Sequence, residues 1–332
     1  MLEKTSEKIV ILGTGGTIAG TSSCRTDNVG YAAAQLSVDQ LISAVPGLQL
    51  AAAGSLLVSE QVAQIDSKDM SFAVWQKLAS RVNFHLHQRD VRAVVITHGT
   101  DTLEETAYFL HSVLESALLA EKPVVLTCAM RPATSAAPDG PQNLTDALTV
   151  AASSGAAGVL AVCAGTVHGA VEVQKVHPYR LDAFNSGDAG PMGYIEEGNV
   201  RWIRGRSGTL AGASAAVLHK VLSVTHWPRV EIVMNYVGAS GAIIDAMMTQ
   251  TAAPPGPVLP VQGLVVDATG NGTVHQELES ALLRAQFNGV AVVLASRCPS
   301  GRVLPTATAV FSDSQGLSPV KARVALMLKL MA

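Results

Sequence analysis

Short, continuously apolar runs recur along the chain, and stretches with helical periodicity lie between them. Apolarity without alternation is typical of strands in a parallel sheet that helices cover on both faces. Helical patterns span 102–119, which opens with Thr102 and Glu105 at capping-box spacing, and 143–154. This alternation predicts an α/β, doubly wound N-terminal domain. Its predicted strands are "KIVIL" (8–12), "AVVIT" (93–97), "PVVLT" (123–127) and "GVLAVC" (158–163).

A second series of apolar runs predicts a smaller C-terminal α/β domain, with strands at 230–236, 263–268 and 290–296. The intervening stretch, about 187–227, is richer in glycine and polar residues and has no clear period. We therefore expect an N-terminal domain over 1–195, a linker over 196–227 and a C-terminal domain over 228–332. These lengths lie within the usual range for domains.

The composition bears on the partners. Only 15% of the 332 residues are charged, against about 25% in ordinary domains. We expect much of the chain to be buried, some of it between subunits, and the alternative is an alanine-rich monomer. The net charge is −3 and no basic stripe occurs, which disfavours nucleic acid as a partner. No apolar run is long enough to predict a membrane span.

The four cysteines are too far apart in sequence for a metal knuckle, and we expect free thiols in a reducing compartment. The opening "MLEKTSEKIVIL" is charged and has no long apolar segment. These features predict a cytoplasmic protein, or a periplasmic one if a signal peptide has been removed from this chain.

The loop "ILGTGGTIAG" (11–20) follows the first predicted strand. A dinucleotide fingerprint needs G-x-G-x-x-G/A, but counting from Gly13 puts Ile18 at the third small position. No lysine follows to make a phosphate loop, so a nucleotide-dependent oxidoreductase is disfavoured. Gly15 and Gly16 instead allow a sharp turn that lifts Thr14 into a crevice beside backbone N–H groups, where an oxyanion could be stabilised. Taken alone, such a threonine is more often only a turn residue.

A second loop, "ITHGTDTLEET" (96–106), repeats this arrangement with Thr100 and Asp101 after another strand. Two such strand ends would face one crevice. Asp101 could hold a substrate ammonium group or cap the following helix. We interpret His98 in the same loop as a packed structural histidine rather than a base.

Together, "TGGTIAG" and "THGTDT" resemble the two signatures of the bacterial L-asparaginase family, the asparaginase–glutaminase group with a threonine nucleophile. The resemblance continues in order through "EQVAQIDSKDM", "AMRPATSAAPDGPQNL", "GPMGYI", "NYVGAS" and "TGNGT". It implies cofactor-free and metal-free hydrolysis of L-asparagine to L-aspartate and ammonia through a covalent β-aspartyl-threonine intermediate. It also implies a homotetramer, a dimer of dimers, in which a neighbouring subunit completes each site.

The resemblance assigns catalytic roles by position. Thr14 matches the nucleophile, Tyr31 the tyrosine of the mobile lid, and Thr100, Asp101 and Lys175 a Thr–Lys–Asp group. A threonine hydroxyl needs a neighbour to take its proton. Neither tyrosine nor lysine is a base at neutral pH unless its surroundings make it one, so the sequence leaves the base open.

The substrate-binding positions carried over are Ser67, which matches the serine on the α-carboxylate, Lys68, and again Thr100 and Asp101. Lys68 stands where well-known periplasmic members have glutamine, and a cation there would repel an ammonium unless it points away. Because one methylene is worth only about 1–3 kcal/mol of discrimination, this change leads us to predict low glutaminase activity. Thr273 stands where some relatives have an asparagine or serine supplied by the neighbouring subunit.

The alternative to an enzyme is a catalytically weak binding protein of the same fold that captures acidic amino acids. Release of ammonia from asparagine would separate the two.

Overall fold

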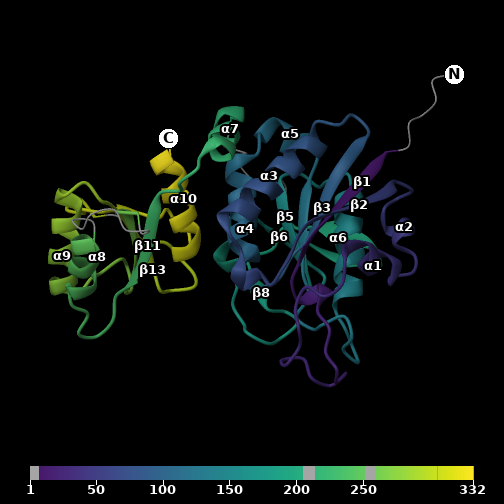
Figure 1. Ribbon diagram of the computed structural model, residues 1–332, viewed down its shortest axis with the longest axis horizontal. Coiled ribbons are helices and arrows are strands. Elements are labelled where there is room, and N and C mark those ends of the chain that lie inside the picture. Colours follow the sequence, from purple (N-terminus) through teal and green to yellow (C-terminus); the bar gives the residue numbers. More distant parts are fainter. Residues whose placement is uncertain (1–6, 205–213, 251–258, 305, 332) are drawn as a thin grey trace. The chain divides into compact units, whose positions relative to one another are not determined.

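The computed structural model describes residues 7–204, 214–250, 259–304 and 306–331 (Figure 1). The chain divides into two compact units, Met1–Leu222 and Ser223–Ala332, and each has a sheet of its own.

The first unit is built on an eight-stranded sheet with the order β10-β9-β6-β5-β4-β3-β1-β2. Strands β2, β1, β3, β4 and β5 run parallel, whereas β6, β9 and β10 join by antiparallel pairings. The bounds of the strands are β1 Lys8–Gly15, β2 Leu56–Ile65, β3 Val91–Thr97, β4 Val124–Thr127, β5 Val159–Cys163, β6 Thr166–Gly169, β9 Gly193–Glu196 and β10 Asn199–Trp202. A separate hairpin pairs β7 Gln174–Lys175 with β8 Phe184–Asn185.

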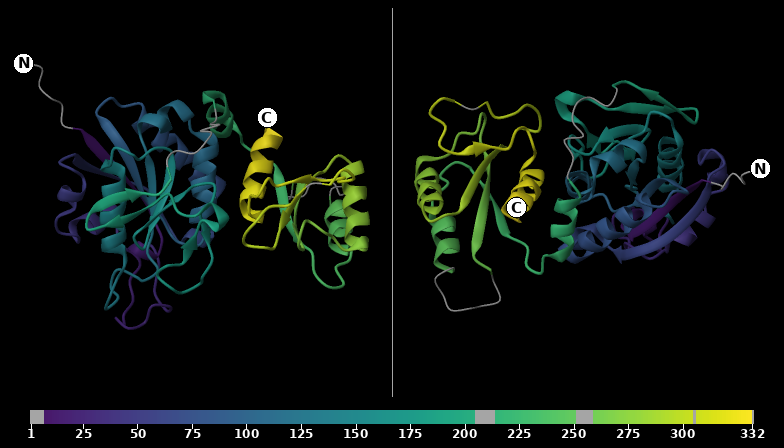
Figure 2. Two further views of the ribbon diagram at one scale, coloured as in Figure 1. Left: turned by 180° about the vertical axis from the view of Figure 1, so that it is seen from behind. Right: turned by 90° about the horizontal axis from the view of Figure 1, so that it is seen from above.

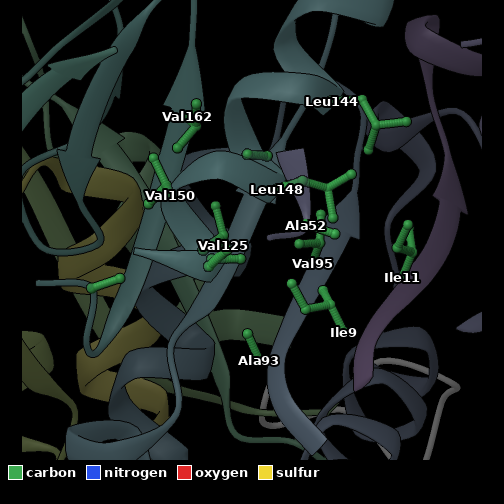
Figure 3. Close-up of a cluster of buried hydrophobic side chains, with 14 of the residues drawn as sticks. Ile9, Ile11, Ala52, Ala93, Val95, Val125, Leu144, Leu148, Val150 and Val162 are labelled. Atoms are coloured by element: carbon green, nitrogen blue, oxygen red, sulfur yellow. The ribbon is translucent and has the colours of Figure 1, made fainter. Parts of the chain in front are cut away.

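Helices cover both faces of this sheet, with α1, α2 and α6 on one side and α3 and α4 on the other (Figure 1). Alternate residues of each central strand therefore enter different cores. Ile9 and Ile11 of β1 pack with Val95 of β3 and Leu148 of α6 (Figure 3), while the intervening strand residues are equally buried. This two-sided burial is why the strands lack polar alternation.

The helices of the first unit are α1 Val38–Ser43, α2 Leu48–Ala51, α3 Phe72–Leu86, α4 Leu103–Val113, α5 Ser116–Glu121, α6 Gly140–Ala152 and α7 Ala215–Ser223. Single turns of 3₁₀ helix lie at Thr17–Ala19, Ser67–Asp69 and Gly187–Ala189.

The stretch expected to form one helix over 102–119 is two helices, because the backbone is extended at Leu114 between α4 and α5. The predicted capping box is also absent. Thr102 is the N-cap, but its side chain makes no cap hydrogen bond. Its hydroxyl instead donates to the carbonyl oxygen of Ser67 at 2.8 Å, so a tertiary contact takes the place of the local one.

The range expected to be a linker, 196–227, contains structured segments. Strand β10, Asn199–Trp202, pairs with β9, so the first sheet continues beyond residue 195. Helix α7 follows at Ala215–Ser223. The three ranges drawn from the sequence remain a prediction.

The second unit has a four-stranded parallel sheet with the order β11-β12-β13-β14. Helices α8 and α9 lie on one face of this sheet and α10 on the other (Figure 2). Its elements are β11 Arg229–Met234, α8 Ala242–Gln250, β12 Val261–Ala268, α9 Gln276–Phe287, β13 Ala291–Ser296, β14 Ser312–Asp313 and α10 Pro319–Met331.

The predicted α/β class, with a larger doubly wound N-terminal domain and a smaller C-terminal one, is confirmed. Within the described residues, none of the helices combines the length and apolarity needed to span a bilayer.

Candidate active site

The order of the first sheet defines where a ligand would bind. Strand β1 lies between β2 and β3 in the sheet. The chain passes from β1 to its neighbour β2 on one side and then crosses to β3, its neighbour on the other side, from which it continues to β4. Such a reversal is a topological switch point, and open α/β sheets bind ligands outside the carboxyl ends of the strands there. The two signature motifs lie at these ends, because β1 ends at Gly15 and β3 ends at Thr97.

Glycines let the two loops touch. Gly16 has φ +82°, and a Cβ there would lie 2.3 Å from the Cα of Gly99. A Cβ on Gly99 would in turn lie 2.4 Å from the Ser67 hydroxyl. The backbone therefore leaves no room for side chains at these positions, and three segments far apart in sequence meet here.

The hairpin of β7 and β8 brings a lysine to the loop after β3. The ammonium of Lys175 donates to the Thr100 hydroxyl at 2.9 Å and to Asp101 Oδ1 at 2.6 Å. The backbone N–H of Lys175 donates to Glu104 Oε1 at 3.3 Å, and Glu104 lies in the first turn of α4. The structure thus brings the three residues of the expected Thr–Lys–Asp group together. Sequence reasoning missed Glu104, for which the acidic first turn of α4 was the available signal.

Thr14 is more enclosed than the sequence led us to expect. Its side chain donates to the carbonyl oxygen of Thr97 at 2.9 Å, and the residue is 2% exposed. Within the described part of the chain it makes no hydrogen bond with Lys175 or Asp101. The cause is the parallel pairing of β1 with β3, which sets Gly13 opposite Thr97 and places the Thr97 carbonyl within reach of the next side chain.

Tyr31 reaches the first signature loop from a lid that we define as residues 21–32, closed at its base by an antiparallel bridge between Thr21 and Ala32. The Tyr31 hydroxyl lies 2.6 Å from Thr17 Oγ1. Burial of Tyr31 raises the pKa of its phenol, and the hydrogen bond with Thr17 opposes this in part. The phenol is therefore protonated at neutral pH. Thr17 was missed from the sequence, although it is the fourth residue of the TGGT motif.

Ser67 is tied to the loop that carries Asp101. Its hydroxyl accepts a hydrogen bond from the backbone N–H of Asp101 at 3.2 Å, and the residue is 2% exposed. This bond joins one predicted substrate-binding residue to another.

Lys68, by contrast, is 62% exposed at its side chain. Its ammonium is held by Asp66 Oδ2 at 2.9 Å and by Asp69 Oδ2 at 3.1 Å. The hydrogen bond to Asp66, with that to Asp69, raises the pKa of Lys68. Two carboxylates therefore offset the positive charge of Lys68.

His98 is completely buried. Its Nδ1 lies 2.7 Å from the Gly99 carbonyl oxygen, and because a carbonyl only accepts, Nδ1 carries the hydrogen. Nε2 has no hydrogen-bond partner among the described residues. Burial lowers the pKa of His98 to about 4, so the ring is neutral at pH 7, as suits a packed structural residue.

Thr273 belongs to the second unit. Its hydroxyl donates to the Thr269 carbonyl oxygen at 3.0 Å and lies 3.0 Å from Thr269 Oγ1. These bonds lie within a tight bridge between the two threonines.

The groups at the switch point include several hydroxyls, the Lys175 ammonium and the Asp101 carboxylate, which are groups that nucleophilic acyl transfer uses. In the regions that the structure describes, no group of three or more His, Cys, Asp and Glu residues is placed to hold a metal ion.

Comparisons with known proteins agree with this reading. The N-terminal asparaginase family model matches residues 8–207, and the glutaminase/asparaginase C-terminal domain matches residues 229–332. The chain is 38% identical to "Probable L-asparaginase periplasmic" of Haemophilus influenzae, covering 97% of this chain and 88% of that one. It is 37% identical to "L-asparaginase 2" of Escherichia coli, with the same coverage of both chains.

A solved structure, that of a probable cytoplasmic L-asparaginase from Campylobacter jejuni, is also similar. It superposes with a TM-score of 0.86 at 35% identity, over 98% of this chain and 95% of that one. Two family models that together span nearly all of the chain, and relatives above 30% identity along its length, lead to one conclusion: this chain belongs to the asparaginase family.

Proposed function

We propose that the protein is an L-asparaginase that hydrolyses L-asparagine to L-aspartate and ammonia. The observation that carries the proposal is the pair of contacts from Lys175 to Thr100 and Asp101, 2.9 and 2.6 Å long, beside the loop of Thr14. The family membership and the names of the relatives support the same activity.

The reaction proceeds in two steps with Thr14 as the nucleophile. Its hydroxyl oxygen attacks the carboxamide carbon, the C–N bond breaks, and ammonia leaves with the proton that Thr14 has given up. A water molecule then adds to the ester carbon, the bond to Thr14 breaks, and aspartate leaves as the hydroxyl is restored. No cofactor enters this balance.

Two hydroxyl groups flank this chemistry. Tyr31 with Thr17 relays the proton as a neutral phenol, since burial keeps its pKa raised. Thr100, held by Lys175 and Asp101, orients the water molecule that reacts in the second step. The ammonium of Lys175 stabilises the charge that develops on the attacked carboxamide.

Two other groups hold the amino acid. The carboxylate of Asp101 binds its ammonium, and it is half exposed and able to accept further hydrogen bonds. The hydroxyl of Ser67 binds its α-carboxylate. Because Thr14 and Thr100 are only 2% and 6% exposed, a substrate reaches them when a covering segment moves. The lid that carries Tyr31 is the segment we assign to that movement.

The active species is a homotetramer in which the neighbouring subunit completes each site, with Thr273 as its contribution. Glutaminase activity is low. The ion pairs of Lys68 with Asp66 and Asp69 support this selectivity, because they occupy the side chain at the position where a carboxamide would grip the substrate amine.

Ammonia release from asparagine tests the proposal. We expect turnover by the native chain and loss of at least about 10²-fold in kcat for Thr14→Ala, since no other group replaces the nucleophile. Thr145→Ala is the matched control, because that hydroxyl donates to the Pro141 carbonyl oxygen within α6, and it should leave kcat unchanged. Binding of aspartate by the native chain without any ammonia release would instead identify the binding protein of the same fold.

A further inference from the structure

The lid of residues 21–32 is fastened to another segment of the first unit, the loop over 130–139 between β4 and α6, which we call the latch loop. The lid is the purple loop at the bottom of Figure 1. Four residues of the latch loop in succession, 133–136, bond to the lid or its base, and the bonded residues are 107 to 113 positions apart in sequence.

Two of these bonds use hydroxyl groups. The Thr134 hydroxyl accepts from the backbone N–H of Ser22 at 2.7 Å and lies 3.2 Å from the Ser22 carbonyl oxygen, to which it donates. The Ser135 hydroxyl donates to Asn28 Oδ1 at 2.7 Å, and Ser135 is 3% exposed. Side chains of the latch loop therefore bond the lid both near its start, at Ser22, and near its end, at Asn28.

Backbone bonds complete the attachment. The N–H of Ala136 donates to the Arg25 carbonyl oxygen at 2.8 Å. The N–H of Ala133 donates to the Gly20 carbonyl oxygen at 2.9 Å. The lid is thus held near its tip and at its base.

The latch loop has a fixed form of its own. Asp139 accepts hydrogen bonds from the backbone N–H groups of Met130 and Arg131, both at 2.9 Å. It also accepts from the Asn143 side chain at 3.2 Å, and Asn143 is buried within α6. A loop anchored in this way provides a fixed binding surface for a segment that opens and closes.

We propose that Thr134 and Ser135 are positioning residues that hold the lid closed and thereby place the Tyr31 hydroxyl beside Thr17. Neither residue touches the reacting atoms. The kinetic part of this inference rests on the proposed amidohydrolase function, whereas the lid closure itself can be measured without it.

Trypsin measures closure directly. Cleavage after Arg25 requires the lid to leave the latch loop, because the carbonyl of the scissile bond accepts from Ala136. One neutral hydrogen bond is worth a factor of about five in such an equilibrium. When opening is fast, cleavage follows the open population, so Ser135→Ala should raise the cleavage rate at Arg25 about fivefold. Thr134→Val removes two hydrogen bonds to Ser22 and should raise the rate at least as much.

The controls are matched in chemistry. Ser112→Ala and Thr149→Val each remove a hydroxyl that donates to a carbonyl within its own helix, and they should leave cleavage at Arg25 unchanged. Cleavage after the exposed Arg89 should be the same in every variant. Asn28→Ala removes the acceptor of Ser135 from the lid itself, and combined with Ser135→Ala it should add nothing to the effect of either change alone.

Measurements of kcat then distinguish a positioning role of these two residues from a general loss of activity. We expect the Thr134→Val/Ser135→Ala variant to lose several-fold in kcat for asparagine in the native background and little or nothing in the Tyr31→Phe background, because the latch acts through Tyr31. Equal losses in both backgrounds would overturn the positioning role. An unchanged cleavage rate at Arg25 in both single variants and in Asn28→Ala would overturn the latch.

If the native chain releases no ammonia, the proposed function fails, but the cleavage rates still decide whether the latch exists.

Discussion

At the scale of single residues, each of the two lysines in the candidate site is paired with carboxylates. Lys175 is neutralised by Asp101, and Lys68 by Asp66 and Asp69. The ammonium of the first pair also donates a hydrogen bond to the Thr100 hydroxyl. Under the proposed function, Lys68 occupies the position that contacts the substrate amine, so we expect this group of ion pairs to affect selectivity rather than the chemical step.

We therefore expect the ratio of kcat/KM for asparagine over glutamine to be at least about tenfold, within the range that one methylene provides. Lys68→Gln should lower this ratio, because it restores a carboxamide that can grip the amine of either substrate. The steady-state ammonia assay with both amides measures it. Comparable efficiencies of the native chain on the two amides would contradict the prediction.

His98 makes stability depend on pH. Its pKa in the folded state is about 4, below the ordinary value of 6.5, so between these values the unfolded chain binds the proton and the folded chain does not. Stability from this group is complete above pH 6.5 and declines as the pH falls towards 4, by about 3 kcal/mol in all.

Urea unfolding of the native chain and of His98→Gln at pH 7 and pH 4 tests this. The variant should lose less stability on acidification, by about 3 kcal/mol. The exposed His87 supplies the control, and His87→Gln should keep the native dependence. Parallel losses in the native chain and in His98→Gln would show that His98 is not the group concerned.

At the scale of elements, the site depends on two turns that pack backbone against backbone. The turn after β1 and the turn after β3 meet at Gly16 and Gly99 with no space between them. This contact joins the two halves of the site more tightly than side chains could. In the same cluster, Thr102 bonds the Ser67 carbonyl oxygen instead of making the helix cap expected from the sequence.

Gly16→Ala should therefore destabilise the first unit by more than about 3 kcal/mol, since the methyl group meets the backbone of Gly99. In addition, φ +82° with ψ −171° is a conformation that essentially only glycine adopts. Gly54→Ala is the matched control, because Gly54 has φ +79° but open space around its Cβ position. It should cost only about 1–2 kcal/mol, the conformational part alone. Similar midpoints of urea unfolding for the two variants would refute the steric argument.

At the scale of the whole molecule, the chain comprises two units that each bury a core of their own. The second unit leaves large side chains exposed around the end of β11, including Met234, Tyr236 and Val237. Apolar surface of this kind, on a chain with few charges, favours assembly into the proposed homotetramer.

Light scattering should accordingly give four times the mass of one chain. Dilution that releases single chains should abolish turnover, because in the proposed homotetramer a neighbouring subunit completes each site. Thr273→Ala should raise KM for asparagine and leave the midpoint of urea unfolding nearly unchanged. A monomer with full activity at the same concentration would contradict the assembly.

Much of the fold could be read from the sequence because its signals are local. Continuous apolar runs identified β1, β3, β4 and β5 within a few residues, since both faces of these strands are covered. Strand β2 was not predicted, because polar and partly buried residues interrupt its apolar ones. The small strands β7, β9 and β10 also escaped notice, because two to four residues with mixed burial carry no period. The break at Leu114 was also hidden, since the helical pattern runs through it.

The sequence by itself determined the alternation of strands and helices, the two glycine turns and the residue types that the chemistry needs, because each of these depends on neighbours along the chain. Only the tertiary structure decided that Lys175 bonds Thr100 and Asp101, that Tyr31 pairs with Thr17, that Thr14 is turned towards Thr97, and that the latch loop holds the lid. These contacts join segments up to about 110 positions apart, and no local pattern records which distant side chains a fold will bring within hydrogen-bonding distance.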